Sequence, residues 1–162
     1  MTKESKPWRI LMLQGANMNW LGRREPERYG STTTDELDAM MQARAAECGV
    51  ELEIYYTNIE GDAMNRIYQA VDDGVDGLLM NPAGFQYAGH ALKDCLAAVR
   101  PDLPYIEVHV THRSIEGYLR TLTAERCGGF VPGFGASSGI PALDGWVRLL
   151  ERGTARWQRC ES

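Results

Sequence analysis

The hydrophobic and polar positions of the chain follow two alternating periodicities. Short apolar runs, such as residues 77–81, are typical of strands buried on both faces of a parallel sheet. Between these runs, apolar residues recur every three or four positions, as in helices that pack against a sheet. The pattern predicts five strands, at residues 9–13, 51–57, 77–81, 105–110 and 128–131. It predicts helices at residues 33–49, 62–71, 90–100 and 140–152.

Three of these helices show the stripe that should face the sheet, and the first begins with the capping box Thr33-x-x-Glu36. The predicted buried positions are Leu37, Met41, Ala45 and Cys48; Ala63, Ile67, Ala70 and Val71; and Ile140, Leu143, Val147 and Leu150.

Regular alternation of strands and helices predicts right-handed crossovers and a parallel sheet covered on both faces. Five strands in 162 residues favour an α/β, flavodoxin-like three-layer sandwich. We expect a single domain over residues 1–162, with a polar segment at 1–8 and a surface tail at 153–162. Ligands of such sheets bind beyond the carboxyl ends of the strands. The loops of interest are therefore residues 14–32, 58–61, 81–89, 109–119 and 132–139.

The net charge of -5 argues against a nucleic-acid-binding face, and no apolar run approaches the roughly 18 residues of a membrane span. These features predict a cytoplasmic protein that binds neither nucleic acid nor membrane. Arginine outnumbers lysine, so an anion site would use guanidinium groups. The four cysteines are scattered, and their spacing predicts neither disulfides nor a metal site.

The loop at residues 14–30 has an unusual composition for a connector, with two asparagines, two adjacent arginines and a tyrosine among glycines. A guanidinium close to Tyr29 would favour the phenolate, which makes this side chain a candidate general base.

A second candidate lies in the strand at 105–110, where Glu107 and His109 are two residues apart and therefore share a face. A carboxylate that orients a histidine at a strand end is typical of acid–base chemistry, although a structural pair is the alternative.

Two other chemistries are disfavoured. The pattern Gly135-x-Ser137-x-Gly139 matches a nucleophile elbow, but no histidine follows it, as a serine hydrolase would require. Lys93 occupies a helix-surface position, whereas a Schiff-base lysine must be desolvated.

The motifs together resemble the type II 3-dehydroquinate dehydratases over roughly residues 9–150. The first motif is Gly15-x-Asn17-x-Asn19-x-Leu21-Gly22-x-Arg24-x-Pro26-x-x-Tyr29-Gly30. The others are Asn58-x-Glu60-Gly61, Asn81-Pro82-Ala83, Ala91-Leu92-x-Asp94 and Ile106-Glu107-Val108-His109.

The resemblance implies a hydro-lyase that works through an enolate without metal or cofactor. It implies that Tyr29 is the base, that Arg24 favours its phenolate, and that His109 is the acid, oriented by Glu107. Asn17 would hold a water against the enolate oxygen. The substrate-binding residues that it implies are Asn81, Tyr87, Val110, Thr111 and Arg120, with Asp94 reaching across a subunit contact. It further implies a small cyclic hydroxy-carboxylate substrate and a homo-oligomer, a dodecamer built of trimers.

The chain departs from the family pattern around the substrate, while the acid–base residues remain. The changed positions are Gln14, Ala16, Tyr87, Gly89, His112, Glu116, and Thr121 with Leu122. Tyr87 replaces a substrate-binding histidine, and an expected arginine is absent near Glu116. Two alternatives therefore stay open: a lyase acting on another hydroxylated cyclic carboxylate, and a non-catalytic small-molecule-binding protein.

Overall fold

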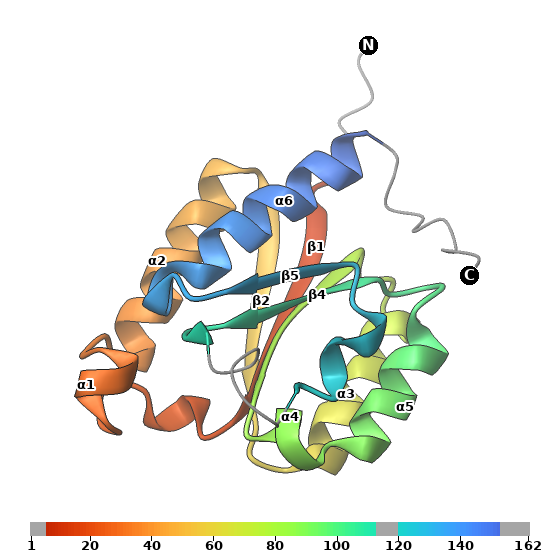
Figure 1. The fold of residues 1–162 in the computed structure, drawn as a ribbon. Helices are drawn as coiled ribbons and strands as arrows, with labels where there is room; N and C mark the ends of the chain where they lie inside the picture. Colours follow the sequence, from red (N-terminus) through yellow and green to blue (C-terminus); the bar gives the residue numbers. More distant parts are fainter. Residues whose placement is uncertain (1–5, 113–119, 153–162) are drawn as a thin grey trace.

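The computed structural model describes residues 6–112 and 120–152. Its centre is a parallel sheet of five strands in the order β2-β1-β3-β4-β5 (Figure 1), which confirms the predicted flavodoxin-like arrangement. The strands are β1 Trp8–Ala16, β2 Val50–Tyr56, β3 Gly77–Ala83, β4 Tyr105–His109 and β5 Gly129–Pro132.

The sheet is covered on both faces, because α2 and α6 lie on one side and α3 and α5 on the other (Figure 1). The α-helices are α1 Pro26–Tyr29, α2 Thr34–Glu47, α3 Glu60–Asp72, α4 Phe85–Ala88, α5 His90–Val99 and α6 Gly139–Glu151. Three 3-10 helices complete the described elements: η1 Met18–Trp20, η3 Thr123–Arg126 and η4 Gly135–Ser138.

Side-chain alternation along β1 produces two separate cores. Ile10 and Met12 pack with α2 and α6, whereas Leu11 and Leu13 pack with α3 and α5. The predicted faces of α2 and α3 are confirmed at Leu37, Met41, Ala45, Ala63, Ile67 and Ala70, which are all buried, whereas Cys48 and Val71 only border the cores.

The prediction for α6 was partly wrong. Leu143 and Leu150 are buried, but Ile140 and Val147 only border the core. The centre of the buried stripe is Trp146, which has no exposed surface and donates its indole N–H to the carbonyl of Leu78 at 3.1 Å. The ring fits because Gly77 has no side chain. A Cβ at this position would lie only 3.0 Å from the nearest atom of the ring.

The first strand is longer than predicted at both ends. It begins at Trp8, inside the expected polar segment, and continues through Gln14, Gly15 and Ala16, which the sequence pattern assigns to the loop. The polar Gln14 stays in the strand because it pairs with Tyr56 on one side and Asn81 on the other. Gly15 allows this close packing, since a Cβ there would lie 2.2 Å from the carbonyl oxygen of Pro82.

Strand order reverses at β1, because β2 lies on one side of it and β3 on the other. A crevice at such a switch point is the usual ligand site of an open α/β sheet. None of the helices in the described residues is long and apolar enough to cross a membrane. The predicted tail at 153–162 lies outside the described residues.

Candidate active site

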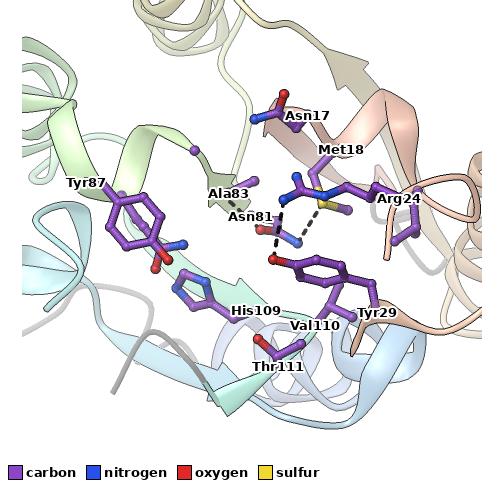
Figure 2. Close-up of a pocket in the computed structure, with 13 residues that line it drawn as sticks. Asn17, Met18, Arg24, Tyr29, Asn81, Ala83, Tyr87, His109, Val110 and Thr111 are labelled. Carbon is purple, nitrogen blue, oxygen red and sulfur yellow. Dashed lines mark hydrogen bonds between the residues drawn. The ribbon is translucent and has the colours of Figure 1, made fainter. Parts of the chain in front are cut away.

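A cleft of about 200 Å³ opens beyond the carboxyl ends of β1, β3 and β4 (Figure 2). It lies at the switch point, and three segments far apart in the chain form its walls. Its lining residues are Asn17, Met18, Leu21, Arg24, Tyr29, Asn81, Ala83, Gly84, Gln86, Tyr87, His109, Val110 and Thr111.

Arg24 and Tyr29 contact each other in two ways. The guanidinium carbon lies 4.5 Å from the centroid of the tyrosine ring, and Nη2 lies 3.3 Å from the phenolic oxygen (Figure 2). A carboxylate oxygen of Glu25 lies 3.8 Å from the same nitrogen, a long distance for an ion pair. The cation is therefore placed close enough to interact with negative charge on the phenolic oxygen.

The short helix α1 brings Tyr29 back toward Arg24, and its start depends on strained backbone. Glu25, which precedes Pro26, has a φ of 35°, and Asn17 and Ala83 have φ values of 76° and 46°. These three are the described non-glycine residues with positive φ, and two of them line the cleft. Such strain is concentrated at functional sites in many proteins, because the surrounding contacts must maintain it.

Side-chain amides hold the loop in this conformation. The backbone N–H of Asn17 donates to Oδ1 of Asn58 at 2.7 Å, which connects the loop to the end of β2. Asn81 is 4% exposed; its Nδ2 lies 3.3 Å from the sulfur of Met18, and its Oδ1 accepts from the N–H of Ala83. In this structure the side chain of Asn81 joins two walls of the cleft.

The opposite side of the cleft carries the predicted histidine. Nε2 of His109 lies 2.7 Å from Oε1 of Glu107, and the two side chains are 4% and 0% exposed. Phe130 packs beside the imidazole, with ring centroids 5.4 Å apart. Because Glu107 contacts Nε2, Nδ1 is the ring nitrogen that this carboxylate does not engage. The hydroxyl of Tyr29 points toward the same space (Figure 2).

Most of the predicted site residues line this cleft: Tyr29, Arg24, Asn17, His109, Asn81, Tyr87, Val110 and Thr111. Glu107 lies behind His109 rather than on the surface of the cleft. Arg120 borders a different hollow, with Leu122 and Phe130, and Asp94 lies on α5, outside the cleft. The structure of a single chain therefore does not bring Arg120 or Asp94 to the cleft.

Of the positions that depart from the family pattern, some line the cleft and others lie outside it. Tyr87 lines the cleft with 44% of its surface exposed, while Gln14 is buried in β1. The ring of His112 occupies the space beside Gly133, where a Cβ would lie 2.1 Å from it. Glu116 is outside the described residues.

Sequence reasoning missed several lining residues, above all Met18, Leu21 and Gln86. Gln86 is 7% exposed and its Oε1 accepts no hydrogen bond from the described part of the chain. It lies in the loop at 81–89 that was expected to carry function, so its position in the sequence could have identified it as a residue of the cleft. Met18 and Leu21 look like ordinary core residues in the sequence.

The described residues contain no group of three or more histidine, cysteine, aspartate or glutamate side chains able to hold a metal ion. Ser137, the serine of the elbow pattern, lies outside the cleft and points toward the sulfur of Met40.

Fold and site together define an α/β protein whose cleft, at the switch point of a flavodoxin-like sheet, holds a tyrosine–arginine pair and a histidine–glutamate pair. The family model described as dehydroquinase class II matches residues 8–147. The chain belongs to this family.

Individual relatives agree with this assignment. The chain is 40% identical over 147 residues to the 3-dehydroquinate dehydratase of Desulforudis audaxviator, an alignment that covers 90% of this chain and 96% of the relative. It is also 40% identical, over 146 residues, to the same-named protein of Thermus thermophilus, covering 89% of this chain and 97% of the relative. Among solved structures, the type II dehydroquinase of Butyrivibrio crossotus is similar with a TM-score of 0.82 and 30% identity, covering 86% of this chain and 97% of that chain.

Proposed function

We propose that this protein is a hydro-lyase that converts 3-dehydroquinate to 3-dehydroshikimate. The observation that carries the proposal is the joint presence, in one cleft, of Tyr29 under the Arg24 guanidinium and His109 on Glu107. Together they supply a base and an acid, which an elimination of water needs and simple binding does not. Family membership and the names of the relatives support the same substrate.

In the proposed mechanism the phenolate of Tyr29 removes a proton from C2 of the substrate. The electron pair of that bond moves into the neighbouring carbonyl and forms an enolate, whose oxygen is stabilised by a water held by Asn17. The enolate then collapses, the bond from C1 to its hydroxyl oxygen breaks, and His109 supplies the proton that makes this oxygen water. Tyr29 and His109 regain their starting states by exchanging protons with solvent.

The remaining lining residues would bind the substrate. Thr111 and the backbone at Val110 are the proposed partners of its carboxylate, and Asn81 the partner of a ring hydroxyl. Arg120 is proposed to contact a ring hydroxyl as well, which requires its side chain to turn away from the other hollow that it borders in this structure.

One observation favours a second candidate, a lyase for a different hydroxylated cyclic carboxylate. Tyr87 lines the cleft at the position where the resemblance implies a substrate-binding histidine. A buried hydroxyl left without its partner costs about 1–3 kcal/mol, enough to change which substrate is preferred.

The test is turnover of 3-dehydroquinate, followed by the ultraviolet absorbance of the conjugated product. We expect activity in the wild type and its loss in Tyr29→Phe, which removes only the phenolic oxygen. Tyr55→Phe is the matched control, because Tyr55 lies in β2 outside the cleft. A folded wild-type protein without turnover would contradict the proposed substrate and favour the second candidate. Full activity in Tyr29→Phe would contradict the proposed base.

A further inference from the structure

Two threonines continue the hydrogen-bonded pair of Glu107 and His109 away from the cleft. The hydroxyl of Thr121 donates to Oε1 of Glu107 at 2.6 Å, and this is the same oxygen that His109 contacts. The hydroxyls of Thr121 and Thr123 lie 3.0 Å apart. A hydroxyl in contact with both groups can fix the position of the carboxylate.

The direction of these bonds follows from the chemistry of the groups. An ionised carboxylate only accepts, so Thr121 donates its one hydroxyl proton to Glu107. The oxygen of Thr121 is then the acceptor for the proton of Thr123. Thr123 is 1% exposed, and its carbonyl accepts from the hydroxyl of Tyr105. The chain of donors therefore ends at groups held in the core.

Glu107 depends strongly on these donors. Its side chain has no exposed surface, and its second oxygen, Oε2, accepts no hydrogen bond from the described residues. His109 and Thr121 thus both contact the carboxylate at Oε1. A buried charge with few partners is costly, and the loss of one of two donors allows the carboxylate to turn.

The segment that carries Thr121 is itself fixed to the wall of the cleft. The N–H of Leu122 donates to the carbonyl of Gln86 at 3.0 Å, and Gln86 lines the cleft from α4. The placement of Thr121 is therefore tied to the placement of the substrate-binding wall.

We infer that Thr121 is a positioning residue that holds Oε1 of Glu107 against Nε2 of His109, with Thr123 supporting its hydroxyl. The carboxylate so held keeps the imidazole in one orientation, with Nδ1 turned to the departing hydroxyl. The inference rests on the proposed function for the reaction served. Thr121 thereby gains a role, whereas in the sequence it was only one of the departures from the family pattern.

The kinetic test compares Thr121→Val, which keeps the shape of the side chain but removes the donor, with Thr121→Ser, which keeps the donor. We expect kcat to fall about tenfold in Thr121→Val with KM changed less than about twofold, and to recover in Thr121→Ser. Thr34→Val is the matched control, because Thr34 begins α2 away from the cleft. If Thr121→Val does not fold, Thr121→Ala replaces it as the variant without a donor.

A second readout needs no substrate. The chain has three histidines, so the ring nitrogens of His109 can be assigned by NMR after labelling histidine with ¹⁵N. We expect the ring signals of His109 to move in Thr121→Val and to return in Thr121→Ser.

The two readouts separate the possible failures. Unchanged His109 signals in a folded variant without the donor would overturn the positioning role, whatever the kinetics show. Equal loss of kcat in the Val and Ser variants would also overturn it. If the wild type does not turn over 3-dehydroquinate, the proposed function fails, and the NMR comparison still decides the role of Thr121.

Discussion

The contact of Arg24 with Tyr29 depends on the shape of the guanidinium as well as on its charge. The flat group lies over the tyrosine ring and extends one nitrogen to the phenolic oxygen, at 4.5 Å and 3.3 Å. A lysine ammonium cannot do both, because it is a compact point charge. We therefore expect Arg24→Lys to lower kcat about 10- to 100-fold, as measured by single-turnover kinetics.

Arg23 provides a close control for this prediction. It is adjacent in the chain and also lies over an aromatic ring, 5.1 Å from the centroid of Trp20, but it does not line the cleft. Arg23→Lys should leave kcat within about twofold of the wild type. Equal effects of the two substitutions would mean that the loop, and not the contact with Tyr29, needs arginine.

Cys127 gives a pH-dependent prediction outside the cleft. Burial raises the pKa of its thiol from 9.0 to about 11, and the nearby Glu107 contributes in the same direction. Because the thiolate is the reactive form, the reaction of Cys127 with iodoacetamide should be slow at pH 8 and rise about tenfold per pH unit until near pH 11. Mass spectrometry of the labelled peptide measures the rate, and urea-unfolded protein, whose thiol titrates near its ordinary pKa, is the control. A native rate that levels off near pH 9 would contradict the effect of burial.

Polar side chains at the cleft were more predictable than the apolar side chains that shape it. Glu107 and His109 were singled out because two ionisable groups on one face of a buried strand are costly unless they are paired. Met18 could not be found, since an apolar side chain that borders a cleft has the same local pattern as one in the core. Arg120 was predicted at the substrate, but its side chain borders another hollow, and no pattern in the sequence reports that difference.

At the scale of elements, the contact between β3 and α6 depends on the absence of a side chain at Gly77. A Cβ at this position would lie 3.0 Å from the ring of Trp146, which has no exposed surface. We expect Gly77→Ala to lower the free energy of unfolding by about 1–3 kcal/mol, because neither the ring nor the strand can move freely. Urea denaturation at a fixed protein concentration measures the change.

Gly145 in α6 is the matched control, because a Cβ there meets no atom within 4 Å. Alanine is the better helix former, so Gly145→Ala should raise the free energy of unfolding by about 0.5–1 kcal/mol. Opposite signs for the two substitutions would attribute the loss at Gly77 to the contact with Trp146. Two losses of equal size would instead indicate that any added methyl group is harmful in this region.

Periodicity predicted the type and order of the main elements but not their ends. The capping box at Thr33 located the start of α2, because both of its hydrogen bonds are local and are present in the structure. The extension of β1 to Ala16 could not be predicted, since it depends on pairing with β2 and β3, which are distant in the sequence. The same limit applies to α6, where Gly77 on another element selects Trp146 as the buried residue.

At the scale of the whole molecule, we propose that twelve chains form a dodecamer built of trimers, as the family resemblance implied. We propose the exposed surface of α3 and α5 as a contact between chains. Ile59, which precedes α3, and Tyr68 in α3 are 61% and 42% exposed, and Asp94 is exposed on the neighbouring α5. Analytical ultracentrifugation should give twelve chains of 18.1 kDa, about 220 kDa in all. A mass of one or three chains would contradict the dodecamer.

In the proposed assembly, Asp94 would reach the cleft of a neighbouring subunit, since it does not line the cleft of its own chain. If Asp94 acts on a neighbouring subunit, Asp94→Ala and Tyr29→Phe damage the same cleft from two different chains. Each variant alone should lose at least about 90% of the activity. Hybrids formed by refolding a one-to-one mixture should recover about a quarter of it, because one cleft in four then combines an intact Tyr29 with an intact Asp94 from its neighbour. Asp102→Ala, an exposed aspartate beyond α5, is the control and should keep full activity. Hybrids with no more activity than the average of the two variants would show that Asp94 does not act across a subunit contact.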